Sequence, residues 1–307
     1  MLIIFESLLP IFLLIVLGQV LRKANFVPEE TWPGMERISY FLFFPTLLFW
    51  TVYAADFGEL AAAEAAAGFL TAIGILLILM LLLRKPIESA LGLSPASYSS
   101  FYQTTTRWNG FIILAIAEKL TGAPGLAIVA IGMGAMVGPI NVVNIAVVTA
   151  LGEREGPRLN VFRQIATNPI ILAVIAGVAA NLTGFRMYAP LETTLQLVAQ
   201  VSLPLGLLLV GAGLRIRLPN RALIAAAIAT FIKLAVMPAL FAACAWWYGV
   251  RGDTLMVVAL CGAGPAAMNG YVVARELGGD APLFAVIVTL QTFVCFFTIP
   301  VVIALLS

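Results

Sequence analysis

Long apolar segments alternate with short polar connections along almost the whole chain. A helix of about 20 residues crosses the ~30 Å hydrocarbon core of a bilayer. The hydrophobic pattern predicts ten such helices, at approximately residues 3–21, 33–54, 60–83, 97–120, 124–151, 161–182, 191–213, 221–248, 254–277 and 282–306. We therefore expect an all-α, polytopic membrane protein with ten transmembrane helices.

The composition narrows the possible functions. The 307 residues are 62% apolar and 10% charged, with a mean hydropathy of +1.06, whereas soluble domains are about half apolar and a quarter charged. The chain has no His, and its three Cys lie in apolar segments without the spacing of a metal site. We expect no enzyme, metal, cofactor or nucleic-acid partner; the expected partners are the lipid bilayer and a small solute.

The two halves of the sequence match at a nearly constant offset of about 159 residues. The matching elements are Pro10-Ile11 with Pro169-Ile170, Gly18 with Gly177, Pro45 with Pro204, and Asn109-Gly110 with Asn269-Gly270. An ordered series at one offset indicates an internal repeat. We expect one repeat over residues 1–151 and the other over 160–307, and five spans in each would make the repeats inverted.

The distribution of Lys and Arg predicts the orientation, because cytoplasmic loops carry more of both. With the N-terminus outside, three would lie outside: Lys119, Arg186 and Arg251. Twelve would lie inside: Arg22, Lys23, Arg37, Arg84, Lys85, Arg154, Arg158, Arg163, Arg215, Arg217, Arg221 and Arg275. We expect both termini on the outer side of the inner or plasma membrane.

Two spans carry interruptions at matching places. The fourth has a polar run from Gln103 to Gly110, and the ninth has Gly262-Ala263-Gly264-Pro265. Proline suits the first turn of a helix, so we expect a half-helix to start at about Pro265, with Asn269 one turn in. Broken helices at mid-membrane are typical of secondary transporters.

These crossed, broken helices predict a binding site for an organic anion. Half-helix N-termini present free N–H groups and positive dipole ends, and an Arg can bind a carboxylate through two hydrogen bonds. The candidate substrate-binding residues are Arg107, Asn109, Gly110, Pro265, Asn269 and Gly270. Arg107 could instead pair with carbonyls at the break, and the asparagines could serve only helix packing.

Supporting or coupling roles are predicted for Lys233, Gln103, Asn141 and Gln291. An ionisable residue inside a span indicates function. Lys233 could bind substrate, hold a carbonyl of a broken helix, or change protonation during transport. Helix packing is the simpler role for Asn141 and Gln291.

These features together resemble the auxin efflux carrier family, which includes plant PIN-type carriers and bacterial permeases for malate or malonate. The shared features are the inverted halves, Asn109-Gly110, the Pro265 break, and Lys233 upstream of Pro238. The resemblance implies a fold like that of bile acid sodium symporters and sodium/proton antiporters. It implies a scaffold and homodimer platform from spans one, two, six and seven, and a moving transport domain from the other six.

The resemblance also implies carboxylate binding near Asn109 and between Pro265 and Asn269. The sequence departs from the family in two respects. The connection between the halves is only about ten residues long, and Thr105 stands where the repeat would place the counterpart of Pro265. The first break could therefore be made by Asn109-Gly110 alone.

The sequence as a whole predicts a secondary transporter that moves a small mono- or dicarboxylate, auxin- or malate-like, by alternating access. A sodium-coupled organic anion symporter of the bile acid type is the nearest alternative. A channel or a receptor is a more distant one.

Overall fold

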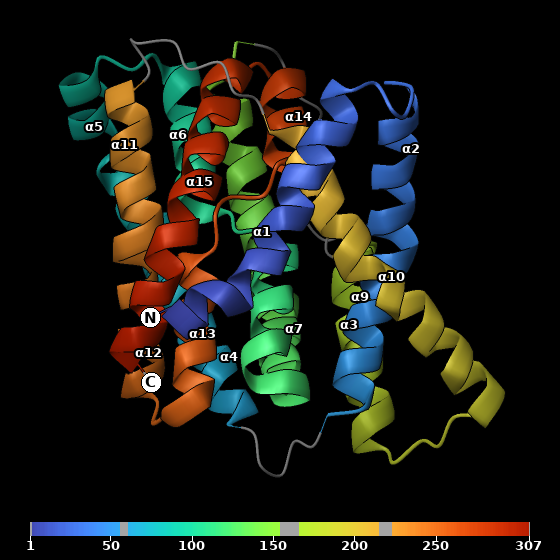
Figure 1. Ribbon diagram of the computed structural model, residues 1–307. Helices are drawn as coiled ribbons and strands as arrows, with labels where there is room; N and C mark the ends of the chain where they lie inside the picture. The colour runs from blue at the N-terminus through green and yellow to red at the C-terminus, as the bar shows by residue number, and fades with distance from the viewer. Residues whose placement is uncertain (1, 56–60, 154–165, 215–222, 307) are drawn as a thin grey trace.

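The computed structural model describes residues 2–55, 61–153, 166–214 and 223–306, and these residues form an all-helical membrane protein (Figure 1). Five of its helical segments are long and apolar enough to cross a membrane: Ala62–Leu82, Pro95–Leu151, Ala189–Gly213, Leu223–Trp247 and Ala281–Leu306. The predicted helical membrane class is confirmed. Several features of the sequence lie outside the described residues, namely Arg154, Arg158, Arg163, Arg215, Arg217, Arg221 and the first residues of the segments expected at 161–182 and 221–248.

The first half of the chain forms a series of helices. They are α1 (Leu2–Lys23), α2 (Thr31–Ile38), the π-helical turn η1 (Ser39–Phe43), α3 (Phe44–Tyr53), α4 (Ala62–Leu82), α5 (Arg84–Leu91), α6 (Pro95–Thr106) and α7 (Gly110–Leu151). The expected segments 97–120 and 124–151 run on without a loop, and Gly122 turns the chain inside α7 with φ 65° and ψ −145°. Only glycine adopts such a conformation without strain.

The second half forms another series of helices. Its helices are α9 (Pro169–Leu182), α10 (Ala189–Gly213), α11 (Leu223–Phe231), the π-helical turn η3 (Ile232–Val236), α12 (Met237–Trp247), α13 (Gly252–Ala263), α14 (Asn269–Leu277) and α15 (Ala281–Leu306). Pro45 and Pro238 each follow a π-helical turn. Such turns are a common site of helix distortion.

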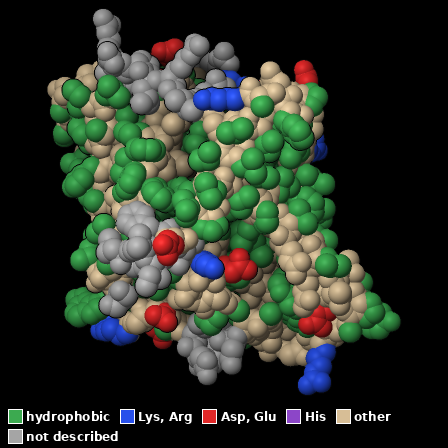
Figure 2. Space-filling model, in the orientation of Figure 1, with side chains coloured by type: hydrophobic (Ala, Val, Ile, Leu, Met, Phe, Trp, Pro, Cys, Tyr) green, Lys and Arg blue, Asp and Glu red, His purple; other side chains and the backbone are tan. Residues whose placement is uncertain are grey.

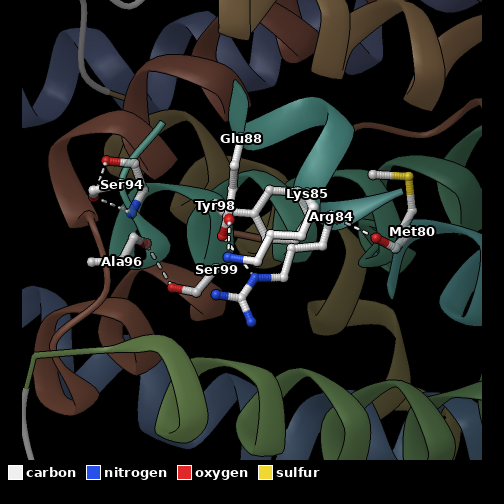
Figure 3. A network of polar contacts seen from close by, with 9 residues as sticks. Met80, Arg84, Lys85, Glu88, Ser94, Ala96, Tyr98 and Ser99 are labelled. Atoms are coloured by element: carbon white, nitrogen blue, oxygen red, sulfur yellow. Dashed lines mark hydrogen bonds and ion pairs between the residues drawn. The ribbon is translucent and has the colours of Figure 1, made fainter. Parts of the chain in front are cut away.

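Helix α5 was not predicted from the apolar pattern, because it is short and has no buried residue. It lies beside the start of α6, where Arg84 and Lys85 pair with Glu88 and the Tyr98 hydroxyl donates to the Met80 carbonyl (Figure 3). The Tyr98 contact joins α6 to the end of α4. The turn between α4 and α6 is therefore held by polar contacts.

Glycines allow two pairs of helices to approach closely. A Cβ on Gly18 of α1 would overlap the Leu208 carbonyl of α10, and one on Gly177 of α9 would lie 2.8 Å from the Phe49 carbonyl of α3. Gly18 and Gly177 are the glycines that match between the two halves of the sequence. Each half thus contributes its first helix to a close crossing with the other half.

The face seen in Figure 2 has the pattern expected of a protein in a bilayer. Hydrophobic side chains cover a broad band across its upper middle, while Lys, Arg, Asp and Glu gather toward its upper rim and its lower part. Large apolar side chains on the surface, such as Leu82 and Ile175, are 73% and 60% exposed. Contact with lipid rather than water gives these side chains a favourable environment.

Candidate substrate site at two crossing helix breaks

The first break lies between α6 and α7. Helix α6 ends at Thr106, and Arg107 and Asn109 are extended, with ψ angles of 156° and 105°. The Asn109 side-chain oxygen accepts from the backbone N–H groups of Phe111 and Ile112 at 3.1 and 3.3 Å. Asn109 is therefore the N-cap of α7, since it satisfies N–H groups that the start of a helix leaves free.

The second break lies between α13 and α14, and it corrects one prediction. Helix α14 begins at Asn269 and not at about Pro265, and Gly264 before the proline is extended. In a helix starting at Pro265, that residue's carbonyl would accept from the Asn269 N–H. It accepts instead from the Asn109 N–H at 2.7 Å, so Pro265 lies in the break and contacts the other broken helix.

Gln291 of α15 connects the same two breaks through its side chain. Its oxygen accepts from the Ala266 N–H at 2.9 Å, and its nitrogen donates to the Thr104 carbonyl at 3.0 Å. Both backbone groups lost their helical partners where the helices break. Gln291 is fully buried, and its amide gives these two backbone groups the hydrogen-bond partners that they would otherwise lack inside the protein.

Lys233 of η3 binds a third backbone group at the breaks. Its ammonium lies 3.0 Å from the carbonyl of Gly262, in the last turn of α13, and 2.8 Å from the Met237 sulfur. In a continuous helix the Gly262 carbonyl would accept from the Ala266 N–H. Here that N–H donates to the Gln291 side chain instead. Of the three roles considered for Lys233, this geometry supports the holding of a broken-helix carbonyl.

Arg107 lies at the centre of the polar groups around the first break. Its Nε donates to the Gln103 side-chain oxygen at 3.1 Å, and its Nη1 donates to the Asn141 side-chain oxygen at 2.7 Å. A Cβ on Gly270, in the first turn of α14, would lie 3.1 Å from the Arg107 Cδ. The sequence assigned these four residues to the site region, and the fold brings them together from α6, α7 and α14.

Two donors in this group have no hydrogen-bond partner among the described residues. They are the Nη2 of Arg107 and the Nε2 of Gln103, and both are buried; Arg107 is 4% exposed and Gln103 is 0% exposed. Leaving a buried donor unsatisfied costs about 1–3 kcal/mol, and more when the group is charged. The two side chains are joined through the Arg107 Nε, so the free donors belong to one cluster.

The buried charges in the described part of the chain are all of one sign. Arg107 and Lys233 are the charged side chains among the buried residues in the described part of the chain. Arg107 also lies against the N-terminal turn of α14, where the helix dipole is positive. A buried cation at a positive helix end is unfavourable unless an anion neutralises it.

The two matching asparagines have different environments. Asn109 is buried and caps α7, whereas Asn269 is exposed and is the first residue of α14, with no side-chain cap at that helix. The two asparagines match in the sequence but have different roles in the structure. A contact that the sequence reasoning missed joins Thr106 to Asn144, whose side-chain oxygen accepts from the Thr106 hydroxyl at 3.1 Å.

Comparisons with known proteins agree with this architecture. Residues 157–303 match the model of a family described as membrane transport protein, Mem_trans. A putative malonate transporter of Rhizobium meliloti (strain 1021) is 28% identical over 297 residues, which cover 88% of this chain and 85% of that protein. The resemblance seen in the sequence is thereby confirmed in the form of a Mem_trans domain, the domain of the auxin efflux carrier family, over residues 157–303.

Proposed function

We propose that this transporter carries a small organic anion, a mono- or dicarboxylate, and binds it at the Arg107 and Gln103 side chains beside the crossing breaks. The observation that carries the proposal is the pair of unpartnered donors, Nη2 of Arg107 and Nε2 of Gln103. A carboxylate accepts hydrogen bonds through both oxygens and is negatively charged. It would satisfy both donors and neutralise the buried guanidinium at once.

The surroundings of the cluster favour an anion over a cation as the transported species. Arg107, Lys233 and the N-terminus of α14 all contribute positive charge near the breaks. Within the described ranges, no three His, Cys, Asp or Glu side chains are grouped closely enough to hold a metal ion. The positive charge therefore supports an organic anion as the transported species.

The proposal includes ten transmembrane helices in two inverted repeats, residues 1–151 and 160–307. The breaks after α6 and α13, at the fourth and ninth expected spans, support this arrangement. So do the close crossings of α1 with α10 and of α9 with α3, because a symmetric pair of contacts is expected when two inverted halves interlock. Both termini lie in the lower half of Figure 1, and we propose that this is the outer side.

The mechanism that we propose is alternating access. Helices α6, α7, α13 and α15 share hydrogen bonds through Asn109, Asn141, Lys233 and Gln291, together with η3. With α4, α11, α12 and α14 they would move as one transport domain. Helices α1, α2, α3, α9 and α10 would form the scaffold and the platform of a homodimer. Substrate drives such a change only if it binds the two states with different free energies.

Malonate is the first substrate to test, because a relative of similar length is named as its putative transporter. The purified protein would be reconstituted into liposomes, and uptake of labelled malonate would be measured with and without sodium and proton gradients. We expect uptake that excess malonate or malate inhibits and that a sodium gradient does not require. Absence of uptake for every mono- and dicarboxylate, in a folded protein, would refute the proposal.

The site itself is tested by Arg107→Gln, with Arg186→Gln as the matched control. Arg186 is exposed and lies in the turn before α10, so its replacement should leave uptake unchanged. We expect Arg107→Gln to abolish uptake. Equal uptake by the two variants would exclude Arg107 from the binding site.

A further inference from the structure

A cavity of about 680 Å³ lies outside the crossing breaks and is not used by the Arg107 cluster. Four helices form its walls: α1, α3, α7 and α10. Glu118 and Lys119 lie at its rim and are exposed, while Leu47, Ala115, Leu203 and Leu207 line it at the ends of the walls nearest the first break. Its lining residues come from α3 near its C-terminal end, from the middle of α10 and from α7 on both sides of Gly122. The lower ends of α3 and α7 lie in the half of Figure 1 that contains both termini.

Polar residues contribute to two walls of the cavity. Thr51 lines it and is 7% exposed, and its buried Oγ1 has no hydrogen-bond partner within the described ranges. Gln196 and Gln200, one turn apart on α10, line the same space. Gln196 is partly exposed and Gln200 is exposed, so their amides are free to bind water or a polar solute in the cavity.

Two aromatic rings lie one helical turn beyond the lining of this cavity, on the side of the first break. Phe44 lies one turn from Leu47 on α3, and Phe111 lies one turn from Ala115 on α7, in both cases toward the break. Their ring centroids are 4.2 Å apart. Phe44 also lies against Gly110, where a Cβ would be 3.2 Å from its ring, and Gly110 follows Asn109, the N-cap of α7.

The backbone of α10 is shaped to hold the second ring. A Cβ at Gly206 would overlap the Phe111 ring, so only glycine leaves room for it there. Phe111 is partly exposed, whereas Phe44 is 4% exposed. Phe111 thus projects from α7 onto α10. The proposed mechanism places α7 in the transport domain and α10 in the scaffold.

We infer that the cavity is the access chamber through which the carboxylate reaches the crossing breaks from the side of the chain termini, and that Phe44 and Phe111 close it. The inference rests on the proposed function for the identity of the solute. Motion of α7 relative to α10 would withdraw the Phe111 ring from Gly206 and open the chamber to Asn109 and Arg107. The aromatic pair blocks the passage by filling it, since apolar rings exclude hydrated anions.

The chamber is tested by thiol labelling, which does not depend on transport. Ala115→Cys places a thiol in the chamber, and Ala117→Cys places one on the same helix at a fully buried position that does not line it. A charged, membrane-impermeant thiol reagent would be added from the side of the termini. We expect Ala115→Cys to react at least about ten-fold faster than Ala117→Cys, because buried thiols are unreactive; equal rates would refute the chamber.

The closure is tested with a deeper thiol. The Met133 side chain lies against Gly110, and Met133→Cys should be protected from the same reagent. Combining it with Phe111→Ala should expose it, while Phe293→Ala, which removes a ring that is 67% exposed, should leave it protected. Protection that survives Phe111→Ala in a protein with an unchanged melting temperature would overturn the inference, whatever the uptake assay finds.

Discussion

The backbone N–H of Asn109 donates to the carbonyl of Pro265 over 2.7 Å. Each group would have had a partner in its own helix had that helix been continuous. The two breaks therefore satisfy one another, and the polar backbone that would be costly inside a membrane is paired within the protein. Side chains of Gln291 and Lys233 complete this pairing, so the crossing is a connected network.

Gln291→Leu should destabilise the protein strongly. The substitution leaves the Ala266 N–H and the Thr104 carbonyl without partners, and each buried unsatisfied group costs about 1–3 kcal/mol. We expect the thermal midpoint in detergent to fall. Gln196→Leu, at a cavity-lining position on α10, is the control and should change the midpoint little; equal effects of the two would contradict a bridging role.

Lys233→Ala should lower the free energy of unfolding by about 2–5 kcal/mol, because it removes a long buried side chain and frees the Gly262 carbonyl. Lys23→Ala, at an exposed position near the end of α1, should change it by less than about 0.5 kcal/mol. Denaturant titration followed by Trp fluorescence measures both. If the Lys233 variant is as stable as the Lys23 variant, the hydrogen bond from Lys233 to the Gly262 carbonyl does not contribute to stability.

Gly18→Ala should separate α1 from α10. The added methyl group would overlap the Leu208 backbone, and overpacking of this kind costs about 1–3 kcal/mol. Gly74→Ala in α4 meets no atom within 4 Å and should stabilise its helix by about 0.5–1 kcal/mol. Melting temperatures that move in the same direction for both variants would contradict this account of the crossing.

Arg107→Lys should reduce uptake even though it keeps the positive charge. The planar guanidinium of Arg107 donates to Gln103 and Asn141 and still directs a third nitrogen, Nη2, toward the proposed substrate. Lysine has no such planar group with several fixed donors. A hydrogen bond to a charged group contributes about 1.5–3 kcal/mol, so we expect a loss of about ten- to hundred-fold in the apparent affinity for substrate. The concentration dependence of initial uptake rates gives this affinity, and the exposed control Arg186→Lys should match the parent protein.

Glu88 should make a small contribution to stability that depends on pH. Burial acts to raise the pKa of its carboxyl, but hydrogen bonds from Arg84 and Lys85 outweigh burial and hold the pKa below the ordinary value of 4.5. The contribution is therefore present above that value and is lost as the pH falls through the lowered folded-state pKa. Thermal midpoints of the parent protein and Glu88→Gln should differ at neutral pH and converge in acid; a constant difference would exclude the ion pairs as the cause.

Much of the fold could be predicted because bilayer thickness and hydrophobicity are properties that each segment carries by itself. The apolar runs indicated helices wherever the described chain has long ones, and Gly-Pro in the ninth expected span indicated a break. Helix α5 was not predicted, because a segment of eight residues with no buried side chain cannot be distinguished from a polar turn by its sequence. The start of α14 was misplaced because local proline chemistry favoured a helix at Pro265, whereas a hydrogen bond from another helix holds that residue outside it.

The sequence indicated which buried polar side chains gather near the breaks, but not which groups they bind. Composition and position alone marked Arg107, Gln103, Asn141 and Gln291 as polar groups too costly to face lipid. Only the tertiary structure decided that Asn109 caps α7, that Gln291 joins both breaks, and that free donors remain on Arg107 and Gln103. Those outcomes depend on which carbonyls and N–H groups each helix leaves unpaired and on which neighbours reach them first, and residues far apart in the chain supply these neighbours.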